Sequence, residues 1–179
     1  MAKLLRNPLT RFLGLGTVLY LAWYSFYEFY IRPKTGVDAF VIHAIVEHSR
    51  WLLEALGCTL EPATDRDGFQ NAVAILGSPG VTVGAPCDGM ALFGLFSVFI
   101  LAYPGKLLHK AWFVPAGIAI VHAVNVARVA GLAVIMDVNP SWLAFNHDYT
   151  FTLLVYGVVF ALWYLWVQRF GPPLKPRKL

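Results

Sequence analysis

The chain has 179 residues, of which 58% are hydrophobic and only 13% are charged, and its mean hydropathy is +0.61. This charged share is about half that of a typical soluble domain, so the composition disfavours a soluble protein and predicts one compact membrane domain, residues 1–179. The pI is about 9.2, but the basic residues cluster at the borders of apolar runs and form no stripe with interleaved aromatic residues, so we expect a lipid bilayer and no nucleic acid as a partner.

Four apolar runs predict an all-α integral membrane bundle with four transmembrane helices. The runs cover residues 12–31, 88–103, 111–136 and 149–170. Each is close to the ~20 residues that a helix needs to cross the hydrocarbon, and the second is the shortest. The first run lacks a small-residue cleavage site, so we expect a retained anchor rather than a signal peptide, and Arg32-Pro33 should end it.

The segment 32–86 is expected to lie outside the membrane with structure of its own. Residues 37–56 carry apolar side chains at helical spacing, which predicts a helix lying at the outer interface and ended by Gly57. Its apolar positions are Phe40, Ile42, Ile45, Val46, Trp51, Leu52 and Leu53, and its polar ones are His43, Glu47, His48, Arg50 and Glu54.

A cysteine opens the second apolar run. Residues 71–76 and 81–83 flank a Gly-Ser-Pro-Gly turn and predict a short β-hairpin that leads into Cys87. A helix N-terminus carries a partial positive charge that favours a thiolate, and Gly89 lets a backbone or ligand approach closely. Cys87 is therefore a candidate nucleophile; the alternatives are a small buried apolar residue, or a disulfide with Cys58.

A cation lies inside the third run. Arg128 is eight residues before Met136, which is about 12 Å below the outer end at ~1.5 Å per residue. An Arg at that depth is costly unless it is paired or faces a polar cavity, so we favour a functional cation over snorkelling to the interface. Asn125 shares its helical face, and His122 lies one turn further down, where it could support Asn125.

An imidazole stands before the fourth run. His147 follows Asn146 at the outer start of that run, where it can exchange protons with water. The alternative is an interfacial histidine, with Asn146 as the helix cap. The histidines lack zinc-ligand spacing and the chain has no nucleotide-binding glycine loop, so the sequence predicts neither a metal site nor a cofactor.

Basic residues orient the predicted spans. They precede the first run, separate the second from the third and follow the fourth, whereas residues 137–147 contain no Lys or Arg. The residues concerned are Lys3, Arg6, Arg11, Lys106, Lys110, Arg169, Lys175, Arg177 and Lys178. Because cytoplasmic loops are enriched in Lys and Arg, we expect both termini in the cytoplasm and the three candidate side chains near the outer surface.

At these residues the chain resembles the exosortase/archaeosortase family of membrane cysteine transpeptidases, in its short bacterial form. The resemblance rests on Ala85-Pro86-Cys87-Asp88-Gly89 at the start of one span, Asn125-Val126-Ala127-Arg128-Val129 inside the next and His147 before the last. It covers residues 81–170, about half of the chain. Asp88 departs from the family's commonest motif, in which many members have Ser.

The resemblance implies an activity and a place for it. Cys87 would be the nucleophile, Arg128 would stabilise the oxyanion or a substrate carboxylate, and His147 would be the general acid and base. Such enzymes cleave the C-terminal sorting signals of exported proteins through a thioester, in the bacterial inner (cytoplasmic) membrane with the site facing the periplasm. Supporting roles would fall to Asn125, Asp88, Gly89 and Asn146.

Two other kinds of function stay open at this point. A non-catalytic membrane assembly factor would use Arg128 and Asn125 as polar contacts between helices. A cysteine-dependent acyltransferase would act on lipid instead of protein. The substrate, the acceptor (water, an amine or a lipid) and the oligomeric state are also left open by the sequence.

Overall fold

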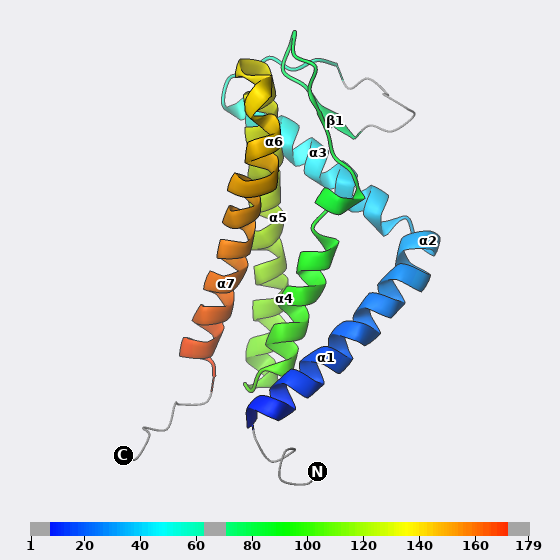
Figure 1. Cartoon of the computed structure of the whole chain (residues 1–179), viewed down its shortest axis with the longest axis vertical. Helices are drawn as coiled ribbons and strands as arrows, with labels where there is room; N and C mark the ends of the chain where they lie inside the picture. The colour runs from blue at the N-terminus through cyan, green and yellow to red at the C-terminus, as the bar shows by residue number, and fades with distance from the viewer. Residues whose placement is uncertain (1–7, 63–70, 172–179) are drawn as a thin grey trace.

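The computed structural model of the chain describes residues 8–62 and 71–171, and helices dominate both ranges (Figure 1). The helical elements are α1 (Pro8–Phe26), the π turn η2 (Tyr27–Ile31), α2 (Arg32–Lys34), α3 (Val37–Ala55), η3 (Ala85–Cys87), α4 (Met90–Ala102), α5 (Leu107–Val138), η4 (Pro140–Trp142), α6 (Leu143–Phe145), the π turn η5 (Asn146–Thr150) and α7 (Phe151–Arg169). Two short strands, β1 (Ala72–Val73) and β2 (Val81–Thr82), complete the structure. A mostly helical chain with a small hairpin, as predicted, is confirmed.

Two helices in the described ranges are long and apolar enough to cross a membrane. They are α5, with 32 residues, and the continuous helix Pro140–Arg169, with 30. At ~1.5 Å per residue they are about 48 and 45 Å long, against a hydrocarbon core of about 30 Å. α5 runs past both ends of the predicted span 111–136, and the second helix begins before the predicted span 149–170, because residues outside the apolar runs continue the helical hydrogen bonding.

The second predicted span is shorter than expected. Of residues 88–103, only Met90–Ala102 form α4, and these 13 residues reach only about 20 Å. Gly89 interrupts the helix at one end because its φ of 81° lies in the left-handed region, and Pro104 follows the other end. A helix needs about 20 residues to cross the hydrocarbon, so α4 is too short to be the second transmembrane helix that the sequence predicted.

The first predicted span continues past its expected stop. α1 passes through η2 into α2, so that helical structure ends at Lys34, just past Arg32-Pro33 and before Gly36 (φ 64°). Pro33 has no N–H to donate, and it follows the π turn η2, in which the Arg32 N–H donates to Tyr27 O. Near the start of α1, Phe12 packs edge-on against Phe99 of α4. From there the axis of α1 diverges from that of α4 toward the upper end of α1 (Figure 1).

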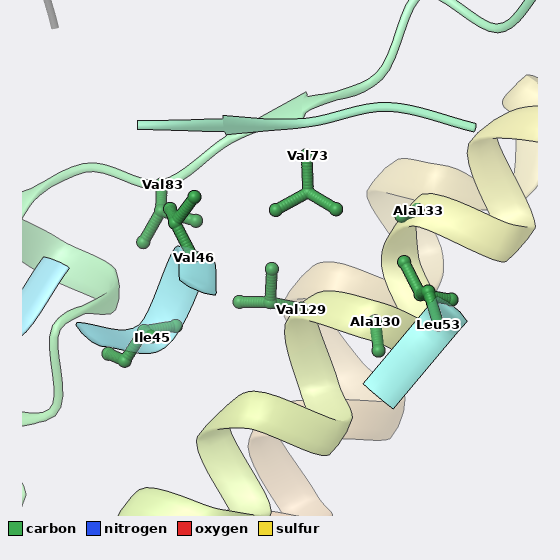
Figure 2. Close-up of a cluster of buried hydrophobic side chains, with 8 residues drawn as sticks. All are labelled: Ile45, Val46, Leu53, Val73, Val83, Val129, Ala130 and Ala133. Atoms are coloured by element: carbon green, nitrogen blue, oxygen red, sulfur yellow. The ribbon is translucent and has the colours of Figure 1, made fainter. Parts of the chain in front are cut away.

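An outer cluster of buried side chains joins α3, the hairpin and the outer part of α5 (Figure 2). Its members are Ile45, Val46, Leu53, Val73, Val83, Val129, Ala130 and Ala133. The prediction of a helix over 37–56 is confirmed, and Gly57 (φ 87°) ends it. The helix buries a narrow stripe that includes Ile45, Val46 and Leu53, while Phe40 and Trp51 stay 73% and 70% exposed.

The hairpin forms where the sequence predicts it. Ala72 pairs with Thr82 and Val73 with Val81 in an antiparallel register. The turn depends on Gly80, which has a φ of 75° and whose missing Cβ would lie 2.6 Å from Ala74. The chain then runs from β2 through Val83, which is buried in the outer cluster, into η3 and Cys87.

A second set of side chains packs α4 between α5 and α7. This bundle cluster consists of Phe96, Ile100, Phe113, Val121, Val155, Val159, Leu162 and Trp166. Cys87, just before the start of α4, packs against the outer cluster.

Candidate active site

Cys87 is the last residue of the 3-10 turn η3, and backbone hydrogen bonds hold it just before α4. Its N–H donates to the carbonyl of Gly84 (2.8 Å), and its own carbonyl accepts from Asn125 Nδ2 (3.0 Å). Asn125 approaches this closely because Gly89 has no side chain; a Cβ there would lie 2.8 Å from Nδ2. Asn125 and Gly89, to which the resemblance gives supporting roles, therefore lie directly against the backbone around Cys87.

The imidazole of His147 lies beside the thiol. Cys87 Sγ is 3.5 Å from His147 Nε2, although 60 residues separate the two in the chain. The other ring nitrogen, Nδ1, is 2.8 Å from Asp148 Oδ1. If Nδ1 carries the proton it donates to Asp148, and Nε2 is then free to accept from the thiol.

Asp148 is a residue that the sequence reasoning missed. A carboxylate that orients a histidine is usually distant in sequence, so a direct neighbour attracts no attention. His147 and Asp148 both lie in the π turn η5. Thr152 adds a bond to this turn by donating to the carbonyl of His147 (3.1 Å).

Arg128 lines the same cavity as the thiol and the imidazole. This nucleophile cavity has a volume of about 390 Å³ and lies between the hairpin segment 80–83, α5 and the α6–η5 turn. Arg128 Nε is buried without a hydrogen-bond partner among the described residues, and the guanidinium forms no ion pair within them. Within the part of the chain that the structure describes, Arg128 therefore has no counter-charge, and it lines the cavity that holds Cys87 and His147.

Asp88 is buried next to the cysteine, with 3% of its surface exposed. It precedes α4, and its Oδ1 accepts from the backbone N–H of Met90 (2.8 Å), which caps the start of that helix. Burial raises the pKa of the Asp88 carboxyl to about 6, because removal from water penalises the charged form.

Three possibilities that the sequence left open for neighbouring residues are not found in the structure. Asn146 is not a cap and does not line the nucleophile cavity, because the helix already begins at Pro140 and Asn146 Nδ2 donates to Trp142 O (2.9 Å). His122 does not support Asn125; its Nε2 lies 2.9 Å from Nδ1 of His48, because α3 crosses α5 there. Cys58 forms no disulfide with Cys87: both are free thiols.

Comparison of the chain with family models, with curated proteins and with solved structures finds no match in any of the three. The functional argument therefore rests on the residues of this site.

Proposed function

We propose that the chain is a membrane-embedded cysteine transpeptidase or protease that removes C-terminal sorting signals from exported proteins. The observation that carries the proposal is the 3.5 Å approach of Cys87 Sγ to His147 Nε2 inside a cavity that Arg128 also lines. A thiol, a base oriented by a carboxylate and a fixed cation are the three parts that acyl transfer needs. The resemblance to the exosortase family supplies the substrate class.

In the proposed reaction His147 takes the proton of the Cys87 thiol. The thiolate attacks a peptide carbonyl, and the oxygen becomes an oxyanion that the guanidinium of Arg128 stabilises. His147 then protonates the leaving amine, so that the C–N bond breaks and a thioester remains on Cys87. An incoming nucleophile gives its proton to His147 and releases the acyl group from sulfur.

The depth of the site suits a substrate that is anchored in the membrane. Asn125, which binds the Cys87 loop, lies 18 residues after Leu107, the first residue of α5. That separation is about 27 Å at ~1.5 Å per residue, close to the thickness of the hydrocarbon core. If the basic end of α5 marks the cytoplasmic surface, the nucleophile lies at the outer boundary, where a substrate's apolar helix would end.

The proposal is tested by comparing the C-terminal peptides of exported proteins in host cells. Mass spectrometry should find that cells with the wild-type protein shorten a set of exported proteins by an apolar tail, and that cells with Cys87→Ala retain these tails. Cys58→Ala is the matched control and should leave processing intact. Continued processing by Cys87→Ala at normal abundance would move the assignment to a non-catalytic membrane factor.

A further inference from the structure

The two strands of the hairpin have different neighbours along their outer edges. On the β1 side the preceding segment continues the pairing, because Glu61 N–H donates to Ala74 O (3.0 Å). Leu60 lies opposite Ile75 there in an antiparallel bridge. On the β2 side no further strand follows in the part of the chain that the structure describes, since the sheet consists of β1 and β2 alone. β2 therefore has a free edge.

The register of the hairpin shows which backbone groups point to this edge. Val83 N–H donates to Asn71 O (2.8 Å), so these two residues form a hydrogen-bonded pair. Hydrogen-bonded and non-hydrogen-bonded pairs alternate along an antiparallel ladder, so the next pair, Thr82 and Ala72, is non-hydrogen-bonded. The N–H and C=O of Thr82 therefore point away from β1, and Thr82 is exposed. Neither group has a hydrogen-bond partner within the described ranges.

The free edge lies on the side of the nucleophile cavity. Residues 80–83, which include the whole of β2, line this cavity, and no residue of β1 does. Ala72 of β1 instead lines a separate pocket beside Glu61. Thr82 therefore offers one backbone donor and one backbone acceptor at the border of the cavity that also holds the Cys87 thiol.

The chemistry of a free strand edge favours one kind of ligand. An unpaired row of N–H and C=O groups is a template for another extended chain, and peptides bind to such edges by adding a strand. A helix cannot do this, because its own N–H and C=O groups are already bonded to each other, and a lipid tail has neither group. The edge of β2 therefore fits a peptide segment in extended conformation.

We propose that the extended segment of an exported protein, directly before its apolar tail, binds as an added strand at the free edge of β2 and so presents its scissile carbonyl to Cys87. The choice of substrate rests on the proposed function. The position fits, because β2 leads through η3 to Cys87, and Arg128 lines the same cavity. Bonds to the main chain accept many sequences, so selectivity falls to the apolar side chains of the cavity, which are Val129, Leu132, Leu143 and Ala144.

Proline at position 82 tests the free edge. Thr82→Pro removes the outward N–H but no bond of the hairpin, and it restricts the preceding residue to the extended conformation that β2 already has. The rate of tail removal from exported proteins, normalised to the amount of protein in the membrane, should fall about tenfold, the order expected for one lost hydrogen bond. Ala72→Pro is the matched control, because it removes the outward N–H of the facing residue on the side away from the cavity, and it should process tails at the wild-type rate.

The reactivity of the thiol separates the edge from the nucleophile. In a protein without Cys58, Thr82→Pro should react with methyl methanethiosulfonate at the wild-type rate, because Cys87 and His147 are unchanged. Wild-type processing by Thr82→Pro would overturn strand addition and leave Cys87 as the nucleophile. Equal losses of processing in Thr82→Pro and Ala72→Pro would also overturn it, since the loss would then belong to the hairpin as a whole.

A photo-crosslinker identifies the occupant of the edge without turnover. p-Benzoylphenylalanine replaces Thr82 in a Cys87→Ala protein in host cells, and mass spectrometry locates the crosslinked residues. They should lie in exported proteins, directly before an apolar tail. The same reagent in place of Trp51, which is 70% exposed on α3, is the control and should give no such crosslinks.

The crosslinks also distinguish failure of the edge site from failure of the proposed function. Crosslinks only to lipid or to a second copy of this chain, or no crosslinks at all, would overturn the peptide site. Crosslinks directly before apolar tails, combined with normal processing by Cys87→Ala, would support the edge site and contradict the cysteine chemistry instead.

Discussion

At the scale of single residues, the site depends on one thiol, one ring and one cation whose positions are set by different elements. His147 meets Cys87 through Nε2 and Asp148 through Nδ1, so the ring is fixed at both nitrogens. Arg128 has no carboxylate partner in the described chain that could hold or neutralise it. Because no partner holds Arg128, substitutions there can test the shape of the guanidinium separately from its charge.

Arg128→Lys should fail nearly as completely as Arg128→Ala if the guanidinium stabilises an oxyanion. Lysine keeps the charge but loses the planar pair of donors, and loss of one such donor lowers the rate by roughly 100- to 1000-fold. The measurement is tail removal from exported proteins, normalised to the amount of each variant in the membrane. Normal processing by Arg128→Lys would argue against a geometric role, and low abundance with normal activity per molecule would indicate a structural one.

Gly89→Ala should disturb the nucleophile as well as the fold. A side chain at φ 81° is strained by about 1–2 kcal/mol, and its Cβ would also displace the Asn125 amide from Cys87 O. Gly57→Ala is the matched control: its φ is 87°, but nothing lies within 4 Å of the added Cβ. Both variants should lower the midpoint of thermal unfolding, and only Gly89→Ala should change the rate of Cys87 labelling by a neutral thiol reagent. Identical labelling in the two variants would show that Asn125 does not position the cysteine.

At the scale of elements, close approach of α4 to its neighbours depends on small residues. A Cβ at Gly117 would lie 2.1 Å from the ring of Phe96, which is fully buried in the bundle cluster, and a Cβ at Gly94 would lie 2.4 Å from the ring of Trp23. α4 is short and nearly uniformly apolar, so these contacts, rather than a polar pattern, determine how it packs.

Gly117→Ala should therefore destabilise the bundle, whereas Gly157→Ala on α7 should not. Overpacking of this kind typically lowers the free energy of unfolding by about 1–3 kcal/mol, because Phe96 has no space to move into. Gly157 has nothing within 4 Å of its added Cβ, and helical Gly→Ala changes otherwise tend to stabilise by up to about 1 kcal/mol. Thermal unfolding in detergent compares the two. An unchanged midpoint for Gly117→Ala would mean that α4 and α5 are packed less closely than described.

The same elements show what the sequence could and could not predict. Apolar runs, Gly57 and the Gly-Ser-Pro-Gly turn predicted the helices and the hairpin, because each depends on local chemistry. The length of α4 and the passage of the first helix beyond Arg32-Pro33 were missed, because they depend on a single left-handed glycine and on a π turn. Cys87, Arg128 and His147 could be named as unusual residues in apolar surroundings. The contact of buried Ser49, which donates to Val126 O at 3.2 Å, required the crossing of α3 and α5, and Asp148 was overlooked because it directly follows His147.

At the scale of the whole molecule, the two clusters divide the structure into two levels. The bundle cluster holds the lower parts of α4, α5 and α7 together, and the outer cluster holds α3 and the hairpin on the upper part of α5 (Figure 1). α5 is about 18 Å longer than the hydrocarbon core is thick, by the same ~1.5 Å per residue. The proposed arrangement places the bundle cluster in the bilayer and the outer cluster beyond it, with the site at the boundary. α1 begins and α7 ends at the lower end, where Arg11, Lys106, Lys110 and Arg169 also lie.

This arrangement predicts how three positions along α5 respond to a membrane-impermeant maleimide. In a protein without Cys58 and Cys87, the variants Leu108→Cys, Ile120→Cys and Val138→Cys each carry one thiol, at sites where the native side chain is 78%, 43% and 76% exposed. Val138→Cys should be labelled in cells with a permeabilised outer membrane, and Leu108→Cys only after the inner membrane is opened, because basic residues orient that end toward the cytoplasm. Ile120→Cys should stay unlabelled in both, since a thiol surrounded by lipid tails meets neither water nor the reagent. Labelling of Leu108→Cys before the inner membrane is opened would show that the orientation is the reverse, with Cys87 on the cytoplasmic side. Labelling of Ile120→Cys in intact membranes would show that α5 does not cross the bilayer.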